Sequence, residues 1–186
     1  MKYILVTGAN KGIGFATVKN IVETHTDTHV FLCSRSKEKG DQSKRALLKD
    51  NPSFEHRVTV VQLDVTDIVS VQNAAIEIRE MLNNNQLYGI VNNAGTANSS
   101  LEYILDVNVH GIHRICSNFL SLLSETKGRI VNVTSAAGPS YVSTCSKEHQ
   151  QLLTKKTVAW LEIENFMKKC LDISGGPKEF HKRGLG

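Results

Sequence analysis

The stretch TGANKGIG at residues 7–14 decides how this sequence is interpreted, because it joins a short apolar run to a segment with helical spacing. The run at residues 3–6 is rich in residues typical of strands, and residues 13–22 carry the helical pattern. The three glycines lack the β-carbons that would keep a pyrophosphate away from the backbone, and the amides of the helix start would point at that group. The stretch therefore predicts a dinucleotide-binding turn, with a glycine-rich turn that holds no ligand as the alternative.

The same alternation of segments continues through the first 135 residues. Short apolar runs predict five strands, at residues 3–6, 30–33, 58–63, 87–91 and 129–133. Longer segments with helical spacing predict four helices, at residues 13–22, 37–49, 68–82 and 101–123. Strands that alternate with helices of this length form right-handed βαβ units. We therefore expect an α/β fold, a three-layer doubly wound parallel sheet of the Rossmann type.

The alternation stops after residue 135. Residues 136–146 are predicted to be a loop, and residues 148–171 a helical segment that places Trp160, Ile163, Met167 and Cys170 on one packing face. We expect one domain, with the dinucleotide-binding part in residues 1–135 and a loop and helical insert in residues 136–186. Since no further β-branched run follows, the sheet is expected to be truncated after its fifth strand.

Composition excludes several classes of protein. With 186 residues, 40% hydrophobic and 22% charged, the chain is expected to be globular rather than disordered. It has no apolar run of the roughly 20 residues that a membrane helix needs and no secretion signal, so we expect a cytoplasmic protein with reduced cysteines and no membrane partner. A net charge of +4 is too small to predict nucleic-acid binding. His110 and His113 lack a third ligand, so no metal site is expected.

The residues at the end of the second predicted strand indicate which dinucleotide the turn would bind. NAD-preferring sites place a carboxylate there for the ribose hydroxyls, whereas a 2′-phosphate is bound by Arg or Lys. The sequence FLCSR at residues 31–35 contains no carboxylate and ends in Arg35, and Lys11 adds a second cation from the glycine turn. The sequence therefore favours NADPH, with two ordinary solvated charges as the alternative.

Further motifs follow the remaining strands in an order typical of one family. They are LDV at residues 63–65, NNAG at 92–95, VNVHG at 107–111 and RIVNVTS at 129–135. Together with the glycine turn, they resemble the short-chain dehydrogenases/reductases over residues 1–135. NKGIG at residues 10–14 and CSKEHQQ at 145–151 are similar to the NADPH-dependent carbonyl reductases within that family.

This resemblance implies an activity and a set of site residues. The activity is the reduction of a small-molecule carbonyl (an aldehyde, ketone or quinone) to an alcohol by hydride transfer from NADPH, carried out by a cytosolic monomer. Ser135 would hydrogen-bond the carbonyl oxygen, and Asn108 would help to hold a proton-relay water. The residues assigned to cofactor binding, by the turn and the resemblance together, are Gly8, Asn10, Lys11, Gly12, Ile13, Gly14, Arg35, Asp64, Val65, Asn92, Ala94 and Gly95.

The sequence departs from the family at its proton donor, a tyrosine followed four residues later by lysine. The residues four positions after the tyrosines at 3, 88, 103 and 141 are Thr7, Asn92, Val107 and Cys145. Tyr141 and Lys147 lie six residues apart, which is the wrong spacing for such a pair. We expect the pair to lie beyond residue 186 and the chain to be inactive by itself. The alternative is a non-catalytic NADP-binding or interaction protein derived from the same family.

A second departure is the spacing between Gly95 and Asn108, which is shorter than in the family. Either a stretch is deleted there or the following helix starts early.

Overall fold

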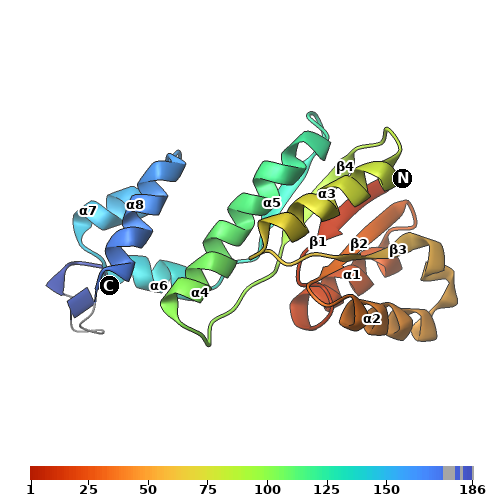
Figure 1. Ribbon diagram of the computed structural model, residues 1–186, viewed down its shortest axis with the longest axis horizontal. Coiled ribbons are helices and arrows are strands. Elements are labelled where there is room, and N and C mark those ends of the chain that lie inside the picture. Colours follow the sequence, from red (N-terminus) through yellow and green to blue (C-terminus); the bar gives the residue numbers. More distant parts are fainter. Residues whose placement is uncertain (174–178, 181, 186) are drawn as a thin grey trace. The chain divides into compact units, whose positions relative to one another are not determined.

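The computed structural model describes residues 1–173, 179–180 and 182–185 (Figure 1). The chain divides into two compact units, Met1–Val133 and Thr134–Gly186. Each unit has hydrophobic clusters of its own. In the part of the chain that the structure describes, no helix is both long and apolar enough to cross a membrane.

The first unit is built on a five-stranded sheet in which every neighbouring pair is parallel, with the order β3-β2-β1-β4-β5. The strands are β1 (Lys2–Val6), β2 (Thr28–Ser34), β3 (Val58–Gln62), β4 (Leu87–Asn92) and β5 (Arg129–Asn132). They confirm the predicted strands and the doubly wound α/β fold. The strand order reverses between β1 and β4, and sheets of this kind bind ligands outside the carboxyl ends of the strands at that point.

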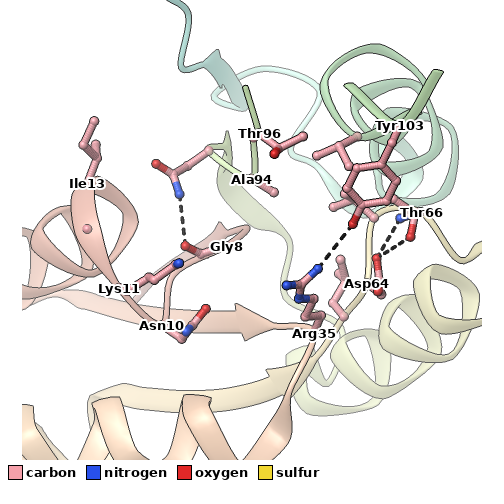
Figure 2. Close-up of a pocket in the computed structure, with 16 residues that line it drawn as sticks. Gly8, Asn10, Lys11, Ile13, Arg35, Asp64, Thr66, Ala94, Thr96 and Tyr103 are labelled. Atoms are coloured by element: carbon pink, nitrogen blue, oxygen red, sulfur yellow. Dashed lines mark hydrogen bonds between the residues drawn. The ribbon is translucent and has the colours of Figure 1, made fainter. Parts of the chain in front are cut away.

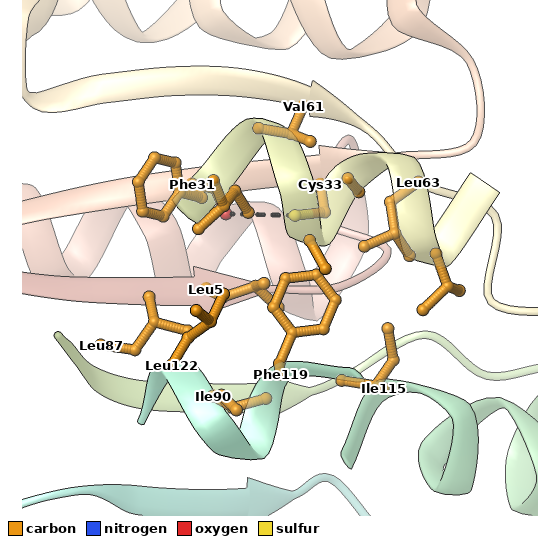
Figure 3. Close-up of a cluster of buried hydrophobic side chains, with 14 of the residues drawn as sticks. Leu5, Phe31, Cys33, Val61, Leu63, Leu87, Ile90, Ile115, Phe119 and Leu122 are labelled. Carbon is orange, nitrogen blue, oxygen red and sulfur yellow. Dashed lines mark hydrogen bonds between the residues drawn. The ribbon is translucent and has the colours of Figure 1, made fainter. Parts of the chain in front are cut away.

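Helices cover both faces of the sheet because successive strand residues point to opposite sides. Leu5 and Phe31 pack in a cluster with side chains of α3 and α5, which Figure 3 shows, whereas Val6 and Leu32 pack in a second cluster with α1 and α2. These helices are α1 (Gly12–Thr24), α2 (Lys37–Asp50), α3 (Ile68–Leu82) and α5 (Gly111–Phe119), and a 3₁₀ turn at Pro52–Arg57 precedes β3. Burial on both faces explains why the central strands are continuous apolar runs.

The single helix expected over residues 101–123 is interrupted. It consists of α4 (Leu101–Leu105), a π-helical turn (Asp106–His110), α5 and a 3₁₀ turn (Leu120–Leu122). In the π-helical turn the Gly111 amide donates to the Asp106 carbonyl, and the Asp106 carboxylate pairs with Arg114 at 2.6 Å. Arg114 also donates to the Val65 carbonyl at 3.0 Å, which ties α5 to the segment after β3. Long-range contacts of this kind leave no periodic signal in the sequence.

Strand β5 lies at one edge of the sheet and differs from the others in burial. It pairs with β4, and all four of its residues are exposed. Even its apolar side chains are exposed, and Val131 has an exposed fraction of 51%. The core of the first unit is therefore built on β1–β4, on both faces of the sheet.

The second unit is helical, with α6 (Ala137–Thr144), α7 (Lys147–Leu153) and α8 (Trp160–Leu171). The loop predicted over residues 136–146 is wrong, because α6 occupies most of it. The Ser135 hydroxyl accepts a hydrogen bond from the Ala137 amide at 3.1 Å, and Pro139 lies in the first turn, where a helix tolerates proline. Gly138 and Pro139 thus lie at a helix start.

The segment predicted as helical over residues 148–171 contains a break between α7 and α8. The Glu162 carboxylate accepts a hydrogen bond from the Ala159 amide at 3.0 Å, which starts a new helix. Met167 and Cys170 of the predicted packing face are buried, whereas Trp160 and Ile163 are half-buried. The hydrophobic cluster of this unit is built from Phe166, Cys170 and Leu185, so it is much smaller than the clusters of the first unit.

Candidate functional site

A cavity of about 540 Å³ lies in the first unit, at the carboxyl ends of β1–β4 (Figure 2). Four loops contribute to its wall, one after each of these strands. The lining residues are Gly8, Asn10, Lys11, Gly12, Ile13, Arg35, Leu63, Asp64, Val65, Thr66, Asn93, Ala94, Gly95, Thr96, Tyr103 and Val107. The cavity thus lies at the strand-order reversal, where the fold places ligands.

The turn between β1 and α1 forms one wall and requires glycine at two positions. Gly8 and Gly12 have φ angles of 61° and 58°, in the left-handed region that side chains disfavour. A β-carbon on Gly8 would also lie 2.9 Å from the Ala94 Cα, whereas one on Gly12 would meet no protein atom within 4 Å. The backbone of Gly12 is therefore open toward the cavity, and a phosphate group can approach it closely.

The loop after β4 is tied to this turn by side chains that the sequence analysis did not assign to the site. The Thr7 hydroxyl accepts hydrogen bonds from the Asn93 and Ala94 amides, both at 3.0 Å. The Asn93 side-chain amide donates to the carbonyls of Thr7 at 2.8 Å and Gly8 at 3.2 Å. Thr7 is buried. These bonds fix the two loops relative to each other.

Two residues predicted to bind cofactor do not line the cavity. A β-carbon on Gly14 would lie 2.4 Å from the Asn93 side-chain nitrogen, so Gly14 allows α1 to pack against the Asn93 bridge. Asn92 is 3% exposed and donates to the Asn132 side chain at 2.8 Å, which joins β4 to β5. The structure gives both residues a packing role. The other predicted cofactor residues all line the cavity.

The charged side chains that line the cavity are Lys11, Arg35 and Asp64. Among the described residues, neither cation forms an ion pair. The Asp64 carboxylate accepts hydrogen bonds from the Thr66 amide at 2.9 Å and the Thr66 hydroxyl at 2.7 Å, which fix its orientation. The cavity therefore presents two unneutralised cations and one anchored carboxylate, a combination suited to an anionic nucleotide.

Asn108 lies in the π-helical turn and does not line the cavity. Its side-chain oxygen accepts from the Thr96 amide at 2.9 Å, and its side-chain nitrogen donates to the Thr96 carbonyl at 2.8 Å. Thr96 does line the cavity. Asn108 thus fixes the backbone of a lining residue through both ends of its amide.

Ser135 and Tyr141 belong to the second unit. Ser135 is exposed, and its hydroxyl accepts from the Ala137 amide. The Tyr141 hydroxyl lies 4.0 Å from the Cys170 sulfur, and burial raises the pKa of the phenol well above its ordinary value. A phenol with a raised pKa releases its proton less readily, and among the described residues no lysine lowers the pKa of Tyr141. Within the described residues, no group of three or more side chains could hold a metal ion.

Comparison with known proteins identifies the family. The family model described as short chain dehydrogenase matches residues 2–155. The chain belongs to this family. The residues that line the cavity all lie within the matched segment.

Relatives of the chain include carbonyl reductases. It is 29% identical to carbonyl reductase [NADPH] 1 of Sus scrofa over 177 residues, covering 90% of this chain and 58% of the relative. Over 108 residues it is 41% identical to (-)-isopiperitenone reductase of Mentha piperita, covering 58% of this chain and 32% of that one. The chain spans about three-fifths of the length of the carbonyl reductases that it matches.

Solved structures agree with the fold. The NADPH-bound carbonyl reductase from chicken fatty liver superposes with a TM-score of 0.65 at 27% identity, over 74% of this chain and 61% of that one. Menthone neomenthol reductase from Mentha piperita has a TM-score of 0.78 at 22% identity, over 98% of this chain and 77% of that one. The second likeness concerns the fold alone.

Proposed function

We propose that the first unit binds NADP(H) in the cavity at the carboxyl ends of β1–β4. One observation carries this proposal: Lys11 and Arg35 line the cavity, neither has a carboxylate partner among the described residues, and residues 31–35 at the end of β2 contain no carboxylate. The 2′-phosphate of NADP(H) is a dianion that can neutralise both cations, whereas NAD(H) would leave them unneutralised. A structural relative contains bound NADPH, which supports the same assignment.

Each part of the cavity has a role in this proposal. The backbone at Gly8 and Gly12 binds the pyrophosphate, and Asp64 with Val65 contacts the adenine end. Arg35 and Lys11 bind the 2′-phosphate. Bound NADPH would supply a hydride to a carbonyl carbon. The wall made by Asn93, Ala94, Gly95 and Thr96 would then limit where the reduced ring and a substrate lie.

We further propose that the activity is reduction of an aldehyde, ketone or quinone to an alcohol. Ser135 would donate a hydrogen bond to the carbonyl oxygen. Asn108 would act as a positioning residue, because both ends of its side chain already hold the Thr96 backbone. The alcohol also needs a proton, and none of the four tyrosines is followed by lysine at the fourth position. These 186 residues by themselves are therefore expected to bind cofactor with no more than trace turnover.

The missing tyrosine–lysine pair also favours a second function, that of an NADP(H)-binding protein without catalysis. Turnover distinguishes the two. NADPH oxidation by the 186-residue chain with a quinone or aldehyde, followed at 340 nm, would contradict both the trace-turnover expectation and the binding-only function. If a longer form containing the pair shows turnover that the 186-residue chain lacks, the reductase proposal is supported and the binding-only function is excluded.

Cofactor binding is tested first, by titrating the 186-residue protein with NADPH and NADH and following the heat of binding and the melting temperature. NADPH is expected to bind and to raise the melting temperature more than NADH does. Arg35→Gln and Lys11→Gln should each weaken NADPH binding roughly tenfold and leave NADH binding unchanged. Arg79→Gln is the matched control, since Arg79 is exposed on α3 and does not line the cavity. Equal affinity for both cofactors would contradict the assignment of the two cations.

A further inference from the structure

Tyr103 lines the cavity from an element that the sequence analysis did not connect with the cofactor. It lies on α4, which begins only six residues after Gly95. The Ser100 hydroxyl accepts a hydrogen bond from the Tyr103 amide at 3.3 Å and so caps this short helix. The short connection between β4 and α4 therefore carries an aromatic side chain to the cavity wall, and Tyr103 is 37% exposed.

The Tyr103 hydroxyl meets the Arg35 guanidinium. Arg35 donates to the Tyr103 oxygen at 3.3 Å, and Figure 2 shows the hydroxyl pointing toward the guanidinium. The backbone of Arg35 is held by Gln62, whose side-chain amide donates to the Arg35 carbonyl at 3.3 Å. A hydrogen bond between residues 68 positions apart thus joins the end of β2 to α4 along the cavity wall.

This contact differs from the usual way of holding an arginine. A carboxylate would hold Arg35 equally well but would neutralise its charge and repel a phosphate. The phenol is uncharged, so the guanidinium keeps its full positive charge. Within the described residues, the Tyr103 hydroxyl accepts one hydrogen bond and donates none. Its proton and the remaining donors of Arg35 are therefore both available to one anion.

We propose that Tyr103 positions Arg35 and donates a hydrogen bond from its hydroxyl to the 2′-phosphate of the cofactor, so that the two residues form one phosphate-binding unit. This inference rests on the proposed function, namely that the cavity binds NADP(H). Tyr103 then contributes to the preference for the phosphorylated cofactor. It contributes little to binding of the part of the cofactor that NADPH and NADH share.

The test uses the 186-residue protein and two small probes, adenosine 2′,5′-bisphosphate and adenosine 5′-monophosphate, which differ by the 2′-phosphate. Tyr103→Phe removes the hydroxyl and keeps the ring. It should weaken binding of the bisphosphate roughly tenfold and leave binding of the monophosphate unchanged. Tyr88→Phe is the matched control, because Tyr88 lies on β4 and does not line the cavity. An equal loss for both probes, or no loss for either, would overturn the proposal.

A double variant tests whether the two residues act together. In an Arg35→Gln background, Tyr103→Phe should weaken bisphosphate binding by only about threefold, since the phenol can still donate its own hydrogen bond to the phosphate but no longer has a guanidinium to position. A full tenfold loss in that background would overturn the joint unit. Failure of the proposed function looks different: the wild-type protein would then bind both probes equally or bind neither. A wild-type preference for the bisphosphate that survives Tyr103→Phe would overturn the Tyr103 proposal alone.

Discussion

The two units of this chain are stabilised in different ways. The first unit buries apolar side chains on both faces of a sheet, and its hydrogen bonds link residues more than 80 positions apart. In its described residues, the second unit has the short helices α6, α7 and α8 and a cluster of Phe166, Cys170 and Leu185, with largely local hydrogen bonds. A cofactor cavity needs loops held in fixed positions, and the long-range hydrogen bonds of the first unit hold the loops of its cavity. The difference indicates that the candidate site depends on the first core and much less on the second.

The largest expected effect is removal of a large side chain from the first core. Phe119 is fully buried between α5 and the sheet, so Phe119→Ala should lower the free energy of unfolding by about 3–5 kcal/mol. Urea unfolding followed by circular dichroism measures it. Leu120→Ala is the control, because the adjacent Leu120 is 58% exposed and should change stability by about 0.5 kcal/mol or less. Similar losses for both variants would contradict the proposed core.

The matching change in the second unit is Phe166→Ala. Phe166 packs against His149 with ring centroids 5.3 Å apart, but its cluster is small and open. We expect a loss of about 2–3 kcal/mol, below that of Phe119→Ala, because the surroundings can collapse into the space. Trp160 is the single tryptophan and belongs to this unit, so its fluorescence follows the unfolding transition. If Phe166→Ala lowers the free energy of unfolding as much as Phe119→Ala does, the two cores do not differ as proposed.

Replacing one glycine in each unit by alanine tests whether the first unit is packed more tightly than the second. In the first unit, Gly14→Ala would press a β-carbon against Asn93 and the Gly8 carbonyl, which should cost about 1–3 kcal/mol and weaken NADPH binding. In the second unit, a β-carbon on Gly138 would meet nothing within 4 Å, so Gly138→Ala on α6 should be neutral or slightly stabilising. Thermal melts with and without NADPH compare the two. Destabilisation by Gly138→Ala would contradict the open space around Gly138 on α6.

The smallest expected effect is a pH dependence from His29 on β2. Burial lowers the pKa of His29 below its ordinary value, and its ring nitrogens contact the His56 carbonyl at 3.1 Å and the Thr59 hydroxyl at 2.9 Å. The unfolded chain therefore takes up this proton more readily than the folded one. Stability should be fully present above about pH 6.5 and should fall as the pH drops below it.

The measurement is urea unfolding at pH 7.5 and pH 5, on the wild-type protein and on His29→Gln. The variant should lose less stability between the two pH values than the wild type. His25→Gln, at an exposed position, serves as the control. An unchanged pH dependence in His29→Gln would remove His29 as its source.

The sequence predicts most of the first unit because its signals are local. Apolar runs mark the strands, and Asp67 is of a residue type favoured at helix N-caps and stands before α3, where its carboxylate accepts from the Val69 amide at 2.9 Å. Glycines in the turn mark the cavity. Thr7 and Asn93 were not assigned to the site because their bonds join residues 86 positions apart. In the second unit the signals are weaker, and glycine with proline at the start of α6 is compatible with both a loop and a helix.

The bonds of Thr7 have a practical consequence for redesign. The loops after β1 and β4 are held together by Thr7, which does not line the cavity, whereas Lys11 and Arg35 line it, and the Arg35 side chain reaches another loop through one hydrogen bond, to Tyr103. Positions 11 and 35 are thus open to exchange by a protein engineer, and positions 7 and 93 are best left alone. In a library that also randomises positions 7 and 93, we expect most variants to be unfolded. Libraries limited to positions 11 and 35 would keep the scaffold and change only which nucleotide it selects.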